Sequence, residues 1–376
     1  MTINDLITHL ISLGLSGDKV AFARQASKLA RLYEASGMID LAKDIRSSIQ
    51  GKETFKLQKA FSANTNALER TDSLPVDYET KFDLADITHP CEDFVEPYFD
   101  NKVFDQIEEF ILFNKRAETL KMAGLSTTSS MILYGPPGCG KTLAAQHISN
   151  KMNLPLLTAR CDSLVSSYLG STSKNIRNLF DFASKQPCIL FLDELDALAK
   201  ARDDQHELGE LKRVVVSLLQ NIDKMPDHTI LIAASNHDSL LDSAIWRRFE
   251  YRLSIGLPDK NVRQKIFSSY VGIEKVYEGF TDDLAAISEG LSCAFITQNC
   301  LRAVRHALIY GDNTVDARFL IENIFDTLEP MSADPEQKTA QIVNKLREID
   351  NKSFTIRKIA KILNLSNAKV SRLTKH

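Results

Sequence analysis

The sequence predicts an α/β protein with a parallel sheet flanked by helices. Two observations carry this prediction. Apolar runs at residues 131–134, 155–158, 188–192 and 229–235 are typical of buried strands, and helix-like stretches separate them. A glycine-rich loop follows the first run directly and opens a helix through Met152. Strand, loop and helix in this order are typical of sheets that bind phosphate groups at their carboxyl ends.

Residues 135–142 are a candidate phosphate-binding loop. The pattern G-x-x-x-x-G-K-[ST] is formed by Gly135, Pro136, Pro137, Gly138, Cys139, Gly140, Lys141 and Thr142, and Leu143 continues into the helix. Glycines let backbone N–H groups and the positive helix end point at phosphate oxygens, and Lys141 adds a full charge. We expect a nucleoside triphosphate here, with Mg²⁺ on Thr142. The alternative is a glycine-rich turn between a core strand and a core helix, which the Lys-Thr pair disfavours.

Two adjacent acids follow the apolar run at residues 188–192. Asp193 and Glu194 lie where a parallel sheet presents its ligand-binding edge. We expect Asp193 to order Mg²⁺ together with Thr142, and Glu194 to polarise the attacking water toward the γ-phosphorus. A buried strand must end in something polar, so one terminal acid would carry little weight. Two acids downstream of a phosphate loop indicate hydrolysis.

Polar residues farther along the chain complete the predicted catalytic set. Asn236 ends the β-rich run at residues 229–235, where its side chain can reach between the γ-phosphate and the water held by Glu194. Arg247 and Arg248 follow a short helix-like stretch, just before another strand-like run. Arginine pairs are commonly solvated surface. If these two point away from their own nucleotide, they can stabilise the transferring phosphoryl group of a neighbouring copy.

With these motifs in order, residues 90 to 310 resemble the AAA+ ATPases, and within them the AAA branch that includes katanin and spastin. The loop at residues 135–142 is similar to Walker A of this P-loop family, and residues 190–194 are similar to Walker B. Asn236 matches sensor 1, and Arg247-Arg248 match the Arg-finger pair. The resemblance implies a ring of six subunits in which the arginines act on the neighbouring nucleotide.

Two positions depart from the usual pattern of this family. Cys139 replaces a frequent threonine in the phosphate loop, which leaves a thiol that can make the ATPase sensitive to alkylation. The lid sequence at residues 289–294 resembles the Ser-Gly-Ala-Asp signature only loosely. The adenine-contacting residues of the lid are therefore left open.

The resemblance also indicates what the ATPase acts on. Tyr168 and Leu169, followed by a glycine, match the aromatic-hydrophobic-Gly loop that grips an extended polypeptide in the channel of these rings. Without this positional match to the family, Tyr168 and Leu169 would be interpreted as residues of the hydrophobic core. The loop at residues 167–171, the stretch at 209–213 and the domain order also resemble bacterial AAA ATPases encoded beside subtilisin-like proteases, some of which act in defence against phage.

Composition is typical of an intracellular globular protein. The chain has 376 residues, 44% of them hydrophobic, and a formal net charge of −3, which gives no overall attraction to nucleic acid or membrane. Six cysteines without a C-x-x-C pair indicate neither a zinc site nor a disulfide scaffold. No secretory signal or membrane-spanning apolar stretch is visible, so we expect a cytoplasmic protein.

These patterns divide the chain into five segments. Helical periodicity at residues 1–50 predicts an N-terminal helical bundle, and the polar, weakly periodic stretch at 51–86 predicts a linker. The further expected segments are the large α/β ATPase subdomain at 87–257, the helical lid at 258–330 and a C-terminal helix-turn-helix at 331–376.

The C-terminal segment resembles a DNA-binding helix-turn-helix. Apolar residues at 359, 363, 365, 370 and 373 have the spacing of such a core, and Asn364 tolerates the left-handed turn conformation. The second helix is expected to expose the DNA candidates Asn367, Lys369, Ser371, Arg372 and Lys375. The alternative is a basic three-helix adaptor that binds no DNA. Two functions therefore stay open: a ring that threads or remodels protein, with a protease as possible partner, and a DNA-recruited ATPase that remodels nucleoprotein complexes or regulates transcription.

Overall fold

The computed structural model describes residues 74–77, 81, 83–91, 93–125, 129–164, 169–197, 208–271, 279–310 and 315–374. The chain divides into two compact units, Met1–Ser73 and Leu74–His376, and the second contains all described residues. Some of the predictions fall outside the described residues. These are the predicted N-terminal bundle, most of the predicted linker, Tyr168 and Lys375.

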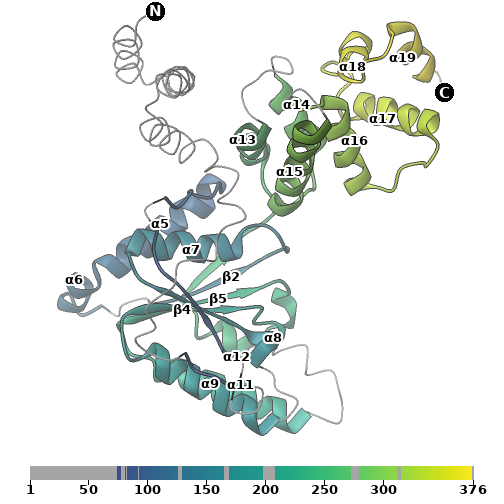
Figure 1. Cartoon of the computed structure of the whole chain (residues 1–376). Helices are drawn as coiled ribbons and strands as arrows, with labels where there is room; N and C mark the ends of the chain where they lie inside the picture. The colour runs from purple at the N-terminus through teal and green to yellow at the C-terminus, as the bar shows by residue number, and fades with distance from the viewer. Residues whose placement is uncertain are drawn as a thin grey trace, which may run out of the picture. The chain divides into compact units, whose positions relative to one another are not determined.

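The described residues form one six-stranded sheet with the order β1-β3-β4-β5-β2-β6 (Figure 1). Its strands are β1 (Asp86–Thr88), β2 (Ser130–Tyr134), β3 (Leu156–Arg160), β4 (Cys188–Asp193), β5 (Thr229–Ser235) and β6 (Tyr251–Ser254). The edge strand β1 runs antiparallel to β3, and every other pairing is parallel. The predicted α/β fold with a mostly parallel sheet is thus confirmed.

Helices cover both faces of this sheet, which explains why β4 is apolar at every interior position. On one face lie α5 (Asn101–Lys115) and α7 (Lys141–Met152), and α6 (Ala117–Met122) follows α5. On the other face lie α8 (Cys161–Leu164), α9 (Leu169–Ala183) and α11 (Leu208–Asp223) (Figure 1). Along β4, Ile189 and Phe191 belong to the core beneath α5 and α7. Leu190 and Leu192 belong to the core beneath α9 and α11. A strand buried on both sides needs apolar residues at successive positions.

The parallel strands bring three polar segments to one edge of the sheet. β5 lies between β2 and β4, so the segments that follow these three strands are neighbours. They are the glycine-rich loop after Tyr134, the acids that end β4, and the polar residues that end β5. The short elements η1 (Asp238–Leu240) and α12 (Ser243–Trp246) then lead to β6.

The remaining helices are built on a core of their own. They are α13 (Lys260–Val271), α14 (Phe280–Ile287), α15 (Cys293–Tyr310), α16 (Ala317–Leu328), α17 (Pro335–Ile349), α18 (Ile356–Ile362) and α19 (Asn367–Leu373). One hydrophobic cluster runs from Val262 in α13 to Val370 in α19 and includes the fully buried Phe354. The predicted lid and the predicted tail therefore share one core.

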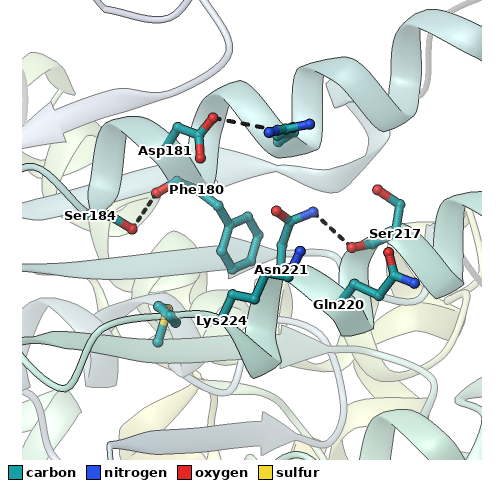
Figure 2. Close-up of a pocket in the computed structure, with 9 residues that line it drawn as sticks. Phe180, Asp181, Ser184, Ser217, Gln220, Asn221 and Lys224 are labelled. Carbon is teal, nitrogen blue, oxygen red and sulfur yellow. Dashed lines mark hydrogen bonds and ion pairs between the residues drawn. The ribbon is translucent and has the colours of Figure 1, made fainter.

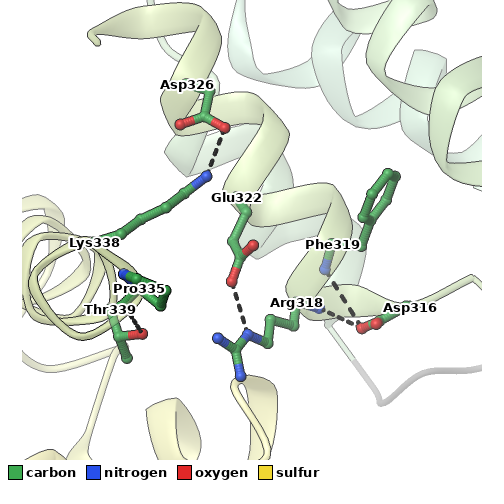
Figure 3. A network of polar contacts seen from close by, with 8 residues as sticks. All are labelled: Asp316, Arg318, Phe319, Glu322, Asp326, Pro335, Lys338 and Thr339. Atoms are coloured by element: carbon green, nitrogen blue, oxygen red, sulfur yellow. Dashed lines mark hydrogen bonds and ion pairs between the residues drawn. The ribbon is translucent and has the colours of Figure 1, made fainter. Parts of the chain in front are cut away.

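Polar contacts fasten the tail helices to the lid helices. Figure 3 shows Lys338 Nζ of α17 donating to Asp326 Oδ2 of α16 at 2.7 Å. Lys358 Nζ of α18 donates to Asp283 Oδ1 of α14 at 2.7 Å. Between α18 and α19, Asn364 adopts the left-handed conformation (φ 53°) expected of it, and Ser366 caps α19 through the backbone N–H of Lys369. Among the described helices, none is long and apolar enough to cross a membrane.

Candidate active site

The glycine-rich loop takes a shape that strongly favours glycine. Gly135, Gly138 and Gly140 have φ angles of 140°, 74° and 104°, in the region that L side chains rarely adopt. At Gly135 there is also no room, because an added Cβ would lie 2.2 Å from the carbonyl oxygen of Ile255. The loop therefore turns sharply from β2 into α7, and the first turn of α7 presents backbone N–H groups suited to an anion.

Lys141 begins α7 and folds back over this loop. Its Nζ donates to the carbonyl oxygens of Gly135 and Pro136, at 2.7 and 2.9 Å. The residue is only 7% exposed, and burial lowers its pKa, while Cys139, Asp193 and Asp196 act in the opposite direction. A buried cation with carboxylates nearby is suited to bind phosphate, which adds further negative charge. Leu143, in the first turn of the helix, is half-exposed.

Thr142 and the acids that end β4 meet at this edge of the sheet. The hydroxyl of Thr142 donates to Asp193 Oδ2 at 3.2 Å. The other carboxylate oxygen of Asp193 accepts the backbone N–H of Glu194 at 2.9 Å. A hydroxyl and a carboxylate that converge in this way fit Mg²⁺, which takes one or two protein oxygens and completes its shell with substrate phosphates and water. The structure thus brings the predicted magnesium ligands together.

Asn236 lies at the same edge, directly after β5. Its backbone N–H donates to Asp196 Oδ1 at 3.1 Å, and the hydroxyl of Ser235 donates to the same oxygen at 3.2 Å. Asp196 was not among the residues predicted from the sequence. Its signal was present in the run Asp193-Glu194-Leu195-Asp196, but the partners lie 39 and 40 residues away, which only the strand order brings into contact.

The lid touches the phosphate loop. The backbone N–H of Ala294, at the start of α15, donates to the carbonyl oxygen of Gly138 at 2.9 Å. A Cβ added at Gly138 would lie 2.9 Å from both the hydroxyl oxygen of Ser292 and the Cβ of Ala294. Although this part of the lid resembles the family signature only loosely, it is placed against the loop that would bind the phosphates.

The thiol of Cys139 differs from the sequence expectation of a reactive group. It is 2% exposed, and burial raises its pKa above the ordinary value. Thiolate is the nucleophilic form, so a buried thiol with a raised pKa reacts slowly. The structure argues against alkylation of Cys139 as a sensitive point of the folded protein.

The arginine pair is separated from the loop of its own chain. The carbonyl oxygen of Arg248 accepts from Ser130 Oγ at the first residue of β2, whereas the phosphate loop follows the last residue. At the usual rise of a strand, the two ends of β2 are roughly 13 Å apart. The Arg248 side chain forms a two-point ion pair with Asp223, at 2.5 Å from Nε and 2.9 Å from Nη2. Arg247 is exposed, and no side-chain partner is found for it among the described residues.

The other predicted site residues are described only in part. Leu169 is the first residue of α9, and its side chain, like Tyr168, lies outside the described part of the chain. In the tail, Asn367, Lys369 and Arg372 are exposed on α19, and Ser371 is partly buried. The polar groove between α9 and α11, which Figure 2 shows with Phe180 at its centre, contains none of the predicted nucleotide-site residues.

Comparison with known proteins finds matches to the central part of the chain. Residues 131–257 match the family described as "ATPase family associated with various cellular activities (AAA)". An uncharacterized AAA family ATPase of Sinorhizobium fredii is 42% identical over 205 residues, covering 54% of this chain and 62% of that protein. A putative cell division cycle ATPase of Plasmodium falciparum is 34% identical over 215 residues, covering 55% of this chain and 18% of that protein.

A third relative has a more informative name. A proteasome-activating nucleotidase of Saccharolobus islandicus is 32% identical over 218 residues, which are 56% of this chain and 56% of that protein. The chain therefore spans less than two thirds of the length of these relatives. Residues 131–257 are thus similar to a domain class that is named for ATPase activity.

Proposed function

From the premise that residues 131–257 form an AAA-family ATPase domain, we propose that the chain binds ATP with Mg²⁺, hydrolyses it, and uses the energy to act on protein substrates. The contact between Thr142 and Asp193 carries this proposal, because it joins the phosphate loop to the end of β4 at 3.2 Å, with Glu194 next in the chain. A phosphate-binding loop without an adjacent acid pair could bind nucleotide without cleaving it.

Each residue at this edge has a chemical role in the proposed reaction. Lys141 and the N–H groups of the first α7 turn neutralise charge on the β- and γ-phosphates. Thr142 and Asp193 would hold Mg²⁺, which supplies further charge stabilisation when bound. Glu194 accepts a proton from the attacking water, and the side chain of Asn236 orients that water.

We further propose that the active unit is a homo-oligomeric ring, a hexamer by resemblance to the katanin and spastin branch. The position of Arg248 at the opposite end of β2 from the loop supports this, because the arginine pair would otherwise have no phosphate to act on. A neighbouring copy that places its own Arg247 and Arg248 at this site would complete it.

The substrate of the ring is proposed to be protein. A relative that matches 56% of this chain is named a proteasome-activating nucleotidase, and that name supports the proposal of a protein substrate. Tyr168 and Leu169 are the proposed pore contacts. A subtilisin-like protease as partner and a role in antiviral defence extend the proposal on the resemblance alone. A cytoplasmic location extends it on the composition of the chain.

Glu194→Gln provides the test of ATP hydrolysis. The amide cannot accept the proton, so we expect hydrolysis to fall by about 10²- to 10⁴-fold while ATP still binds. Glu118→Gln removes an exposed carboxylate on α6 and should keep the wild-type rate. Wild-type turnover in Glu194→Gln would overturn the assigned role. Proteins retained by the ATP-trapped form can then be identified directly.

The ring and the pore are tested separately. Subunits with Arg247→Ala and Arg248→Ala, mixed with Lys141→Ala subunits, should regain part of the ATPase rate. At some interfaces of a mixed ring, an intact phosphate loop of one subunit meets the intact arginines of its neighbour. No recovery at any mixing ratio would contradict action between copies. Tyr168→Ala should keep basal ATPase activity and lose work on a protein substrate, and unchanged unfolding by this variant would remove Tyr168 from the proposal.

The exposure of Asn367, Lys369 and Arg372 favours a second candidate, a DNA-associated ATPase. Duplex binding should then weaken steeply with salt and be lost in the Lys369→Ala, Arg372→Ala double variant, with Lys375 as a further candidate contact. Lys185→Ala, an exposed lysine in the α/β part, is the matched control. No duplex binding by the wild type at low salt would reject this candidate.

A further inference from the structure

The turn that carries Glu194 is held in an uncommon backbone conformation. Glu194 has a φ of 55°, in the left-handed region, which is strained for a residue with a side chain. Such a conformation persists only where surrounding contacts fix it. One of them is the backbone N–H of Leu195, which donates to the carbonyl oxygen of Ala234 in β5 at 2.8 Å. The turn after β4 is thus already attached to the neighbouring strand.

Asp196 adds a side-chain attachment between the same two segments. Its Oδ1 accepts the hydroxyl of Ser235 at 3.2 Å and the backbone N–H of Asn236 at 3.1 Å. The hydroxyl oxygen of Ser235 in turn accepts the backbone N–H of His237 at 3.1 Å. One carboxylate therefore ties the turn with Glu194 to the backbone that carries Asn236.

The burial of Asp196 is unusual for a carboxylate. The residue is 3% exposed, and a buried charge is costly unless hydrogen bonds or an opposite charge compensate for it. The bonds from Ser235 and Asn236 meet part of this cost, and the positive charge of Lys141 lies near enough for Asp196 to influence its pKa. An apolar residue would fill this space at less cost if only packing were required.

We propose that Asp196 is a positioning residue that fixes the spacing between Glu194 and Asn236, so that the water-activating carboxylate and the orienting amide are aligned as one unit. This rests on the proposed ATP hydrolysis. Asp196 does not touch the nucleotide in this assignment, and it acts through the two segments that it joins. Its loss should therefore lower kcat and leave nucleotide binding largely intact, because Lys141 and the phosphate loop are unchanged.

Three substitutions separate positioning from general stability. Asp196→Ala removes the acceptor. Asp196→Asn keeps an oxygen that can accept the same two hydrogen bonds. Asp283→Ala removes a carboxylate of similar burial (6% exposed, against 3%) from the helical core, where it pairs with Lys358, and controls for the loss of a buried acid.

We expect kcat for ATP to fall on the order of 10- to 100-fold in Asp196→Ala, the range for a misplaced catalytic group. The Kd for a fluorescent ATP analogue should stay within about threefold, and Asp196→Asn should recover most of the rate. Hydrogen exchange of the segment at residues 235–237 should be faster in Asp196→Ala, because the backbone N–H of Asn236 has lost its acceptor. It should be near the wild-type rate in Asp196→Asn, which keeps an acceptor oxygen.

Other results would overturn the inference. A wild-type kcat in Asp196→Ala would show that the attachment does not align the site. Equal kcat values in Asp196→Ala and Asp196→Asn would show that the acceptor oxygen at position 196 is not responsible for the rate. If Asp196→Ala does not fold, Ser235→Ala removes one of the two bonds and should show a smaller loss of kcat; a wild-type kcat there would count against the inference. Absence of hydrolysis by the wild-type protein would reject the proposed function instead, while the exchange measurement would still report on the attachment.

Discussion

The α/β part and the helical part of this chain use their polar side chains differently. In the α/β part, two cores sandwich the sheet, and the polar contacts Thr142–Asp193 and Asp196–Ser235 gather at one edge of it. In the helical part, one core serves lid and tail alike, and the contacts Lys358–Asp283 and Lys338–Asp326 join helix to helix. Polar groups that converge on one edge can perform chemistry, whereas those that link helices fix an arrangement. Substitutions at these contacts should therefore change catalysis in the first part and stability in the second.

The largest expected effect tests whether lid and tail form one core. Phe354→Ala removes a fully buried ring between α17 and α18, and such truncations cost about 3–5 kcal/mol. Because the cluster is continuous, hydrogen exchange should rise in α14 and α16 as well as in the tail. Phe295→Ala, on the lid helix α15, removes a ring that is 51% exposed and should change stability little. Increased exchange confined to residues 331–374 would contradict a shared core.

The next effect is the loss of the buried cation in the α/β part. Lys141→Ala should lower kcat/KM for ATP on the order of 10²- to 10³-fold, as for removal of a preorganised charge or donor. Lys151, in the last turn of the same helix, pairs with Glu96 and is the matched control. Lys151→Ala should leave ATP turnover close to wild type. Equal losses in both variants would show that helix stability, and not charge at the loop, is responsible.

A pair of glycines tests the contact between the lid and the phosphate loop. Gly124 and Gly138 have nearly the same φ, 75° and 74°, but an added Cβ meets nothing within 4 Å at Gly124 and meets the lid at 2.9 Å at Gly138. An alanine therefore causes similar backbone strain at the two positions, whereas it causes steric crowding only at Gly138. Gly138→Ala should weaken ATP binding about tenfold, corresponding to about 1.4 kcal/mol of crowding, while Gly124→Ala should not. Equal ATP affinities of the two variants would mean that the lid moves to accommodate the added Cβ without a measurable cost.

The smallest effect concerns pH. His147 of α7 is 1% exposed, and its Nε2 lies 3.6 Å from Glu108 Oε1, too far for a normal hydrogen bond. Burial lowers its pKa below the ordinary 6.5, against the opposing effects of Glu108 and Glu96. The unfolded chain then binds the proton more readily, so stability present above pH 6.5 is lost as the pH falls toward the folded pKa.

Denaturant unfolding at pH 7 and pH 5 measures this contribution to the free energy of unfolding. It amounts to at most about 1.4 kcal/mol for each unit by which the pKa of His147 is lower in the folded than in the unfolded chain. His147→Met should lose less stability between the two pH values than the wild type. Equal losses would mean that another group accounts for the pH dependence.

Local sequence patterns predicted the phosphate loop and the acids after β4, because residue type and spacing within a few positions determine those geometries. Partners distant in sequence were not predictable in this way. Asp196 and Ser235 lie 39 residues apart, and Arg248 and Asp223 lie 25 apart, and they meet only because of the strand order and of how α11 ends. Likewise, periodicity predicted α18 and α19 but not the face of the lid on which they pack.

The core shared by lid and tail has a practical consequence for anyone who divides this protein. Val343, Leu346 and Val370 face the same cluster as Leu320 and Ile324, so a chain cut after α16 would present bare apolar surface to water and tend to aggregate. Shortened versions for biochemistry should keep every residue through α19. A graft of the tail onto another carrier protein would have to bring α14 and α16 with it.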